Sequence, residues 1–226
     1  MKATIIVPAF NESAVILKVI HSIPKRFKGI KKTEILIVDD GSTDDTKILA
    51  QLANVNTASH LINRGLGAAI KTGLEWAKNH NSDIVVTFDG DGQHNPKDIE
   101  RLIQPILQKK ADLVIGSRFK KRQKIPIDRF LLNWLANLAT FLLFGVFSTD
   151  SQSGLRAFSK KAIKLIEFKA DRMEFSSEIL LEAKKHNLKV IEIPTSAIYT
   201  SYSREKGQKN LNAISIFSKF LIRFLR

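Results

Sequence analysis

Ile84-Val85-Val86-Thr87-Phe88-Asp89-Gly90-Asp91-Gly92-Gln93 is an apolar run that ends in two carboxylates separated by one glycine. The run 84–88 predicts a strand buried on both faces, as in a parallel sheet covered by helices. Ligands of such sheets bind at the carboxyl ends of the strands, where Asp89 and Asp91 would lie. Two converging carboxylates suit a hard divalent cation that also binds a diphosphate. A turn rich in glycine and aspartate, without a ligand, is the alternative, and this segment alone does not decide between them.

Similar strands alternate with helical segments along the chain. We predict further strands at 4–7, 34–38, 55–61, 113–115 and 190–193. Helical segments are predicted to open at Asn11, Thr43 and Gly65, after Asn95-Pro96, and near residue 175. This alternation predicts an α/β fold with a mostly parallel sheet flanked by helices. The length of 226 residues, without an internal repeat or a low-complexity linker, fits one domain spanning 1–226.

Two more polar segments follow predicted strands. Asp39-Asp40 comes after the strand at 34–38, and Asn11-Glu12 comes after the strand at 4–7. Such residues also cap helices, which is the simpler interpretation of each segment taken alone. Together with Asp89 and Asp91, however, they place three polar strand ends along one edge of the sheet. This arrangement predicts a pocket for a nucleotide and a cation.

Several residue patterns that would indicate other chemistry are absent. The chain has no cysteine, which excludes disulfides, thiolate metal sites and cysteine nucleophiles. The segment after Asn63 resembles a dinucleotide-binding loop, but Ile70 occupies the place of the third glycine. The five histidines show no metal-ligand spacing, so we expect them to be surface or capping residues.

Positive charge is concentrated in the second half of the chain. The formal net charge is +14, and residues 118–226 hold 21 Lys/Arg against 9 Asp/Glu. An anionic membrane, a nucleic acid and a polyanionic substrate would all suit such a surface. A non-enzymatic nucleic-acid-binding module leaves the acidic strand ends unexplained, and no RRM, KH or helix-turn-helix pattern is present. The N-terminus lacks the pattern of a secretory signal, so we expect a cytoplasmic protein.

Two segments of the second half have the character of membrane-interface helices. The stretch 130–149 is uncharged, but Asn133, Asn137 and Thr140 form a polar stripe along one helical face. This stripe favours an interfacial helix over a membrane span. The tail from Leu211 is also amphipathic, with basic residues beside its apolar face. Packing of both apolar faces against the protein is the alternative.

Taken in order, these segments resemble family 2 glycosyltransferases of the GT-A fold, in the branch of dolichyl-phosphate mannose and glucose synthases. The matching stretches are VPAFNE, IVDDGSTDDT, NRGLGAAIKTG, FDGDGQHNP, IGSR, DSQSGLRAF, EFSSEIL and SREKGQK. The resemblance covers essentially the whole chain. It implies a Rossmann-like, mostly parallel sheet with two amphipathic interface helices at about 128–147 and 210–226.

The same resemblance implies an activity. The chain would transfer a monosaccharide, with inversion, from a nucleotide-diphosphate sugar to a polyprenyl phosphate such as dolichyl or undecaprenyl phosphate. The donor would be a UDP-sugar, with GDP-mannose as the alternative, and the cofactor would be Mg²⁺ or Mn²⁺. The enzyme would be peripherally associated with an anionic membrane surface. A separate membrane protein would be a further partner, because many relatives carry membrane spans.

The resemblance also implies roles for individual residues. The nucleotide would be held by Pro8, Phe10, Glu12, Val38, Asp40, Asp89 and Gly90, and the metal by Asp89, Asp91 and Gln93. The acceptor phosphate would be bound by Arg118, Arg129, Asn133, Lys206 and Lys209, and the catalytic residues would be Asp91, Asp150 and Arg118. Two features depart from the family pattern. The basic loop usually reads G-x-S-K, but Gly207-Gln208-Lys209-Asn210 lacks the serine, and Asn133 stands where serine is common.

The chemistry of the acceptor bears on the role of Asp150. A phosphomonoester has its second pKa near ~6, so its oxygen is already anionic at neutral pH and hardly needs a general base. Asp150 would then position the sugar or the acceptor. The alternative is a hydroxyl acceptor on a glycan or protein, for which Asp150 would be the base.

Overall fold

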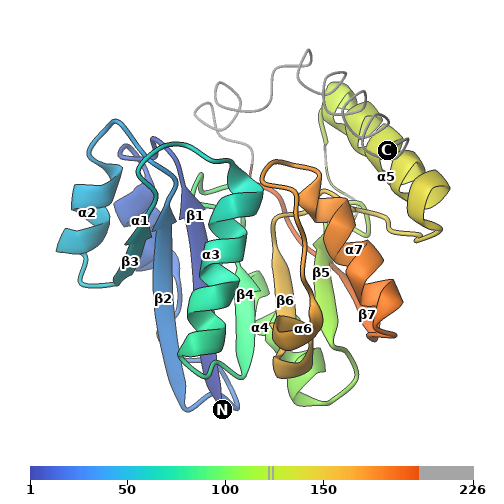
Figure 1. The fold of residues 1–226 in the computed structure, drawn as a ribbon, viewed down its shortest axis with the longest axis horizontal. Helices are drawn as coiled ribbons and strands as arrows, with labels where there is room; N and C mark the ends of the chain where they lie inside the picture. The colour runs from blue at the N-terminus through green and yellow to red at the C-terminus, as the bar shows by residue number, and fades with distance from the viewer. Residues whose placement is uncertain (122, 124, 199–226) are drawn as a thin grey trace.

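The computed structural model describes residues 1–121, 123 and 125–198. Its centre is a seven-stranded sheet with the order β3-β2-β1-β4-β6-β5-β7 (Figure 1). The strands are β1 Lys2–Ala9, β2 Lys32–Asp39, β3 Asn56–Ser59, β4 Ile84–Thr87, β5 Leu113–Ser117, β6 Arg156–Ser159 and β7 Val190–Pro194. The helices are α1 Ile16–Ser22, α2 Thr46–Leu52, α3 Leu66–Asn79, α4 Lys97–Leu107, α5 Ile127–Phe144, α6 Lys160–Leu165 and α7 Phe175–Lys185. The predicted helix at 210–226, Lys206 and Lys209 lie outside the described residues.

The prediction of a mostly parallel sheet is confirmed. β1 pairs in parallel with β2 and β4, and β5 pairs in parallel with β7. β6 is the exception, because it runs antiparallel between β4 and β5. β6 is not among the predicted strands, because Arg156–Ser159 is four residues long and opens with a charged side chain, which is unlike a buried strand.

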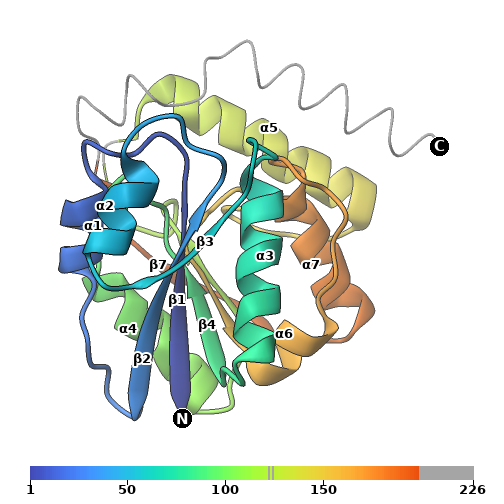
Figure 2. The ribbon, with the colours of Figure 1, turned by 60° about the vertical axis from the view of Figure 1, so that its left-hand side comes forward.

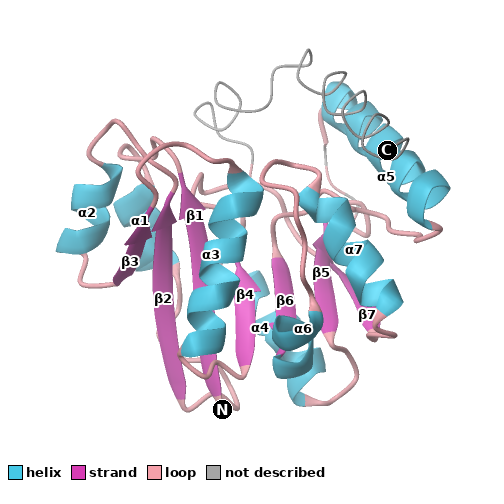
Figure 3. Ribbon diagram, in the orientation of Figure 1, coloured by secondary structure: helices cyan, strands magenta, loops and turns pink. Residues whose placement is uncertain are grey.

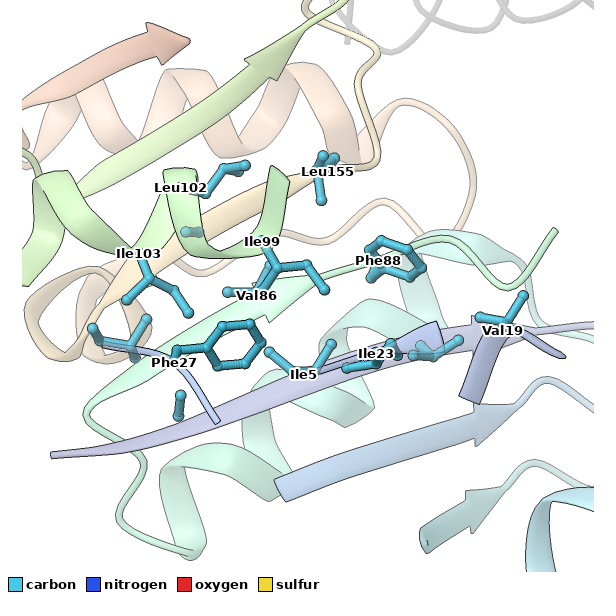
Figure 4. Packing of buried hydrophobic residues seen from close by; sticks show 14 of the residues in the cluster. Ile5, Val19, Ile23, Phe27, Val86, Phe88, Ile99, Leu102, Ile103 and Leu155 are labelled. Atoms are coloured by element: carbon cyan, nitrogen blue, oxygen red, sulfur yellow. The ribbon is translucent and has the colours of Figure 1, made fainter. Parts of the chain in front are cut away.

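Helices cover both faces of the sheet (Figure 3). Alternate residues of a strand point to opposite faces, and β1 shows this with Ile5 and Ile6, both fully buried. Ile5 packs with α1, α4 and Phe27 on one face (Figure 4). Ile6 packs with α3, α6 and α7 on the other. At Gly73 of α3 an added Cβ would lie 2.5 Å from Ile6, so the small residue allows this helix to approach the sheet closely.

Helix α5 lies at the end of the molecule where the parallel strands finish (Figure 2). It ends before Gly145, which adopts a left-handed conformation with φ of 59°. The helix is therefore three residues shorter at its C-terminal end than the predicted 128–147. Within the described ranges, no helix combines the length and apolar character needed to cross a membrane.

Candidate active site

The polar segments that follow β1, β2 and β4 meet at one edge of the sheet. The Phe88 N–H donates to the Ile6 carbonyl at 2.9 Å, which places Asp89 and Gly90 beside the end of β1. A Cβ at Gly90 would lie 2.8 Å from the Pro8 carbonyl oxygen, so the absence of a side chain permits this approach. β2 ends alongside β1 in parallel register. The predicted strand ends are therefore brought together.

Asp89 is fixed from two sides. Its Oδ2 accepts a hydrogen bond from His94 Nε2 at 2.8 Å. Gly154 lies so close to the Asp89 side chain that an added Cβ would be 2.3 Å from each carboxylate oxygen. Burial acts to raise the pKa of Asp89, but nearby positive charge, chiefly that of His94, holds this pKa below its usual value. Asp89 is therefore a fixed, ionised carboxylate at neutral pH.

Asp91 lies in the same site and has the opposite shift. Its Oδ1 accepts from the Gln93 backbone N–H at 2.9 Å, and its Oδ2 accepts from Gln93 Nε2 at 2.5 Å. Burial and the charges of Asp89 and Glu12 raise the pKa of Asp91. Repelling carboxylates in a desolvated site are a donor set that a divalent cation would stabilise. Asp89, Asp91 and Gln93 could therefore hold such a cation.

The predicted nucleotide-binding residues differ in their exposure. Phe10, directly after β1, is 42% exposed, whereas the side chain of Glu12 is largely buried. Val38 is fully buried within β2, so its side chain packs inside the sheet. The described geometry leaves Phe10 as the residue of this group whose side chain is most open to a ligand.

Asp40 is buried and organises the loop at 60–65. Its carboxylate accepts hydrogen bonds from His60 Nδ1 at 2.6 Å, from the Arg64 N–H at 3.0 Å and from the Gly65 N–H at 2.8 Å. This loop leads into α3 and packs against Gly41, where an added Cβ would lie 2.4 Å from the Ile62 carbonyl carbon. A role of Asp40 in nucleotide binding stays a prediction.

Arg118 and Asp150 form a bidentate ion pair after β5. Asp150 Oδ2 accepts from Arg118 Nε at 2.8 Å, and its Oδ1 accepts from Arg118 Nη2 at 2.7 Å. Asp150 Oδ2 also accepts from the Arg118 backbone N–H at 2.9 Å. The Asp150 side chain is 0% exposed and that of Arg118 is 25% exposed. The buried carboxylate thus presents a partly exposed guanidinium to solvent.

The polar stripe of α5 faces the turn that contains Asp150, which we call the 148–154 turn (Ser148 to Gly154). Asn133 Nδ2 donates to Asp150 Oδ1 at 3.0 Å. Asn137 donates to the Thr149 carbonyl and accepts from the Ser151 N–H, both at 2.8 Å. The acceptor-phosphate contact that the resemblance implies for Asn133 stays a prediction; in the structure its side chain is 6% exposed and its amide is bonded to Asp150. Arg129, in the first turn of the same helix, is partly exposed.

The opposite face of α5 is apolar and exposed. Trp134 is 52% exposed and Leu142 is 71% exposed, and they belong to a larger set on this helix. The exposed apolar side chains of α5 are Ile127, Phe130, Leu131, Trp134, Leu135, Leu138, Phe141 and Leu142. A contiguous helical face of this kind indicates an interaction surface rather than scattered surface residues.

The structure corrects the expectation that the histidines are surface or capping residues. His60 and His94 are largely buried, and each pairs with a site carboxylate. His94 comes five residues after Asp89, and His60 lies within the predicted strand 55–61, but neither has a local pattern that distinguishes it. Their roles come from tertiary packing.

Two more charged residues of the site were not predicted. Arg156 is 1% exposed and donates to the carbonyls of Ser151 (2.7 Å) and Ser153 (2.9 Å), within the 148–154 turn. Burial lowers the pKa of Arg156 to about 10, so it stays charged at neutral pH. Glu192 of β7 accepts from the Ser148 hydroxyl at 2.6 Å and from the Thr149 N–H at 2.8 Å. The one sequence feature that could have indicated a buried charge here is the position of Arg156 between apolar neighbours in DSQSGLRAF.

The sequence pattern of Glycosyl transferase family 2 matches residues 4–166. The chain belongs to this family. It is a glycosyltransferase, and its sheet and helices form a GT-A fold.

Individual relatives extend over nearly the whole chain. The chain is 39% identical over 240 residues to the UDP-N-acetylglucosamine–dolichyl-phosphate N-acetylglucosaminyltransferase of Methanococcus voltae, covering 96% of this chain and 94% of that protein. It is 27% identical over 227 residues to the undecaprenyl-phosphate mannosyltransferase of Micrococcus luteus, covering 94% and 88%.

A solved structure supports the assignment of the fold. Glucosyl-3-phosphoglycerate synthase from Mycobacterium tuberculosis, crystallised with Mn²⁺, UDP and phosphoglyceric acid, superimposes with a TM-score of 0.71. The match covers 97% of this chain and 78% of that one at 22% identity. At this identity the similarity establishes the shared GT-A fold.

Proposed function

We propose that this glycosyltransferase transfers a monosaccharide from a nucleotide-diphosphate sugar to a polyprenyl phosphate at a membrane surface, with inversion at the anomeric carbon. The observation that carries the proposal is the Arg118–Asp150 pair, held against a helix whose other face is apolar. A guanidinium in a fixed orientation suits a phosphate, and the apolar face of α5 suits the lipid to which that phosphate is attached.

The contacts of Asp150 favour a phosphate acceptor over a hydroxyl acceptor. A general base must offer an open lone pair to the proton that it removes. Asp150 is fully buried, and its carboxylate already accepts three hydrogen bonds from Arg118 and one from Asn133. A phosphate oxygen, with a second pKa near ~6, attacks as an anion and needs no such base. The alternative function, transfer to a glycan or protein hydroxyl, lacks this support.

The donor would bind at the ends of β1, β2 and β4. Phe10 would face the base, and Asp89, Asp91 and Gln93 would hold Mg²⁺ or Mn²⁺ together with the donor diphosphate. Such a cation, when bound, offsets the negative charge that develops on the departing diphosphate. In residues 1–121, 123 and 125–198 no three His, Asp or Glu side chains form a metal cluster by themselves. The proposal therefore assigns the remaining ligands of the cation to the diphosphate.

The chain's own residues would then orient the acceptor. Arg118 and Arg129 would bind the phosphate and direct one of its oxygens toward the sugar, while Asp150 keeps Arg118 aligned. Asp89 stays fixed by His94 and Gly154, so the donor side need not reorganise during the reaction. Roles for Lys206 and Lys209 in closing over the phosphates remain predictions.

The names of relatives support a UDP-sugar as donor. The Methanococcus voltae relative, which is named for UDP-N-acetylglucosamine, is 39% identical to this chain. The Micrococcus luteus mannosyltransferase is less similar, at 27% identity. UDP-N-acetylglucosamine is therefore the first donor to test. The basic second half of the chain and the apolar face of α5 support peripheral binding to an anionic membrane.

The test is a transfer assay with the full chain. Vesicles containing polyprenyl phosphate, Mn²⁺ or Mg²⁺, and labelled UDP-N-acetylglucosamine, UDP-glucose or GDP-mannose would be incubated and then extracted with organic solvent. We expect the label of one donor to enter the organic phase only when the lipid phosphate is present. Label that stays in the aqueous phase for every donor, or that transfers equally to lipids ending in a hydroxyl, would refute the proposal.

A further inference from the structure

Asn133 is the one residue of the α5 polar stripe that touches the Arg118–Asp150 pair. Its Nδ2 lies 3.0 Å from Asp150 Oδ1, and its side chain is buried. Its own Oδ1 is also buried and has no hydrogen-bond partner among the described residues. An amide with an unsatisfied buried oxygen is a poor choice for stability alone. This points to a use for its N–H.

The N–H of Asn133 completes the set of donors around Asp150. Oδ2 of Asp150 accepts the backbone N–H and Nε of Arg118, and Oδ1 accepts Nη2 of Arg118 together with Asn133. Asn133 therefore donates to this carboxylate from α5, whereas the other three donors all belong to Arg118. Without it, the carboxylate could turn and Arg118 would lose its fixed orientation, because the two groups are joined by paired hydrogen bonds.

We propose that Asn133 is a positioning residue that acts through Asp150 to orient Arg118 for the acceptor, rather than a direct ligand of the acceptor phosphate. This inference rests on the proposed function and deepens it. It also links the Arg118–Asp150 pair to α5, since Asn133 belongs to this helix and the opposite face of the helix would meet the lipid. The position of α5 thereby sets the geometry of the arginine.

The first experiment separates orientation from stability. Asn133→Leu keeps the number and branching of the side-chain heavy atoms, removes the N–H donor and removes the unsatisfied oxygen. We expect a folded variant with a lower melting temperature, because the buried Asp150 loses a hydrogen bond. We also expect a KM for polyprenyl phosphate raised roughly tenfold, as for the loss of one hydrogen bond to a charged group, and an unchanged KM for the donor. Unchanged acceptor KM in a folded variant would overturn the inference.

Thr140→Val is the matched control. Thr140 belongs to the same stripe and is 1% exposed, but its hydroxyl bonds to the Ala136 carbonyl and to Ser177 rather than to Asp150. We expect this variant to lose stability and to keep the wild-type KM for the acceptor. If it raised the acceptor KM as much as Asn133→Leu, the effect would belong to the packing of α5 in general and the inference would fail.

A double-mutant cycle shows whether Asn133 acts through Arg118. Asn133→Leu is combined with Arg118→Lys, which keeps the charge but loses the bidentate pairing. If Asn133 works through Arg118, the two changes together raise the acceptor KM by less than the product of the single effects. Fully multiplicative effects would overturn the inference. If Asn133→Leu fails to fold, Asn133→Asp, which keeps the shape but places a second carboxylate beside Asp150, is used instead and is expected to raise the acceptor KM further.

These outcomes are distinguishable from failure of the proposed function. If the wild-type chain transfers no sugar to any polyprenyl phosphate, the proposed function fails first. If the wild type does so and Asn133→Leu has the same acceptor KM, only the role of Asn133 is refuted.

Discussion

Replacing Gly154 by alanine is expected to displace Asp89 and to disable the donor site while leaving the fold intact. The new Cβ would lie 2.3 Å from both carboxylate oxygens of Asp89, whereas an ordinary contact is about 1 Å longer. The main chain of the 148–154 turn is held by the buried Arg156, so the carboxylate is the group that must move. That movement breaks the 2.8 Å hydrogen bond to His94.

The expected decrease in the rate of sugar transfer follows from the size of this displacement. A misplacement of about 1 Å in a catalytic group lowers the rate roughly 10²-fold. The assay is sugar transfer at saturating donor, acceptor and Mn²⁺, with binding of UDP and Mn²⁺ measured by calorimetry. We expect the transfer rate to fall roughly 10²-fold and the coupled binding of UDP and Mn²⁺ to weaken.

Gly73→Ala provides the control for this substitution. It also introduces a Cβ into a close contact, 2.5 Å from Ile6, but in the core beneath α3. We expect it to lower the free energy of unfolding and to leave the rate per folded molecule unchanged. A transfer rate of Gly154→Ala within about threefold of the wild-type rate would refute the reasoning, because the Asp89 carboxylate would then not need its present position.

Three further outcomes are expected. Asp150→Asn should raise the acceptor KM roughly tenfold or more by misaligning Arg118 but keep measurable turnover; near-complete loss of kcat with unchanged KM would instead indicate a general base. Hydrogen bonds to Asp44 outweigh the effect of its burial and lower its pKa to about 2. Ionised Asp44 therefore contributes about 2 kcal/mol to the free energy of unfolding above pH 4, and this contribution is lost as the pH falls toward 2. Urea unfolding should therefore show that Asp44→Ala costs about half as much at pH 3 as at pH 7. Replacing both Trp134 and Leu142 by aspartate should weaken sedimentation with anionic vesicles without lowering the melting temperature, since both side chains are exposed; unchanged vesicle binding would contradict the role of this face.

The sequence predicted the parts of the site that follow local patterns. The β-branched run before Asp89 identified β4, and the rule that ligands bind at strand ends placed Asp89 and Asp91 at the edge of the sheet where we propose that the donor binds. The spacing of Asn133, Asn137 and Thr140 predicted one polar face of α5. The structure adds that this face points inward to the 148–154 turn, which a helical period cannot reveal.

The other parts of the site depend on contacts between distant segments. The resemblance implies site roles for Arg118 and Asp150, but it does not show that they pair across 32 residues or that Glu192 reaches back 43 residues to Thr149. A charged residue that will be buried against such a partner looks like a surface charge in the sequence. For the same reason β6, which opens with the buried Arg156, was not recognised as a strand.

The 148–154 turn connects the residues that we propose bind the donor with those that we propose bind the acceptor. One end of the turn, Gly154, contacts Asp89, and Asp150 near the other end holds Arg118. Between them the turn's carbonyls accept the guanidinium of Arg156, whose buried charge is offset by Asp150 and Asp89. Isolated, each of these charges would be costly to bury, but together they compensate one another. The same compensation fixes both carboxylates, so Asp89, which we propose positions the donor, and Asp150, which we propose aligns Arg118 for the acceptor, cannot shift independently.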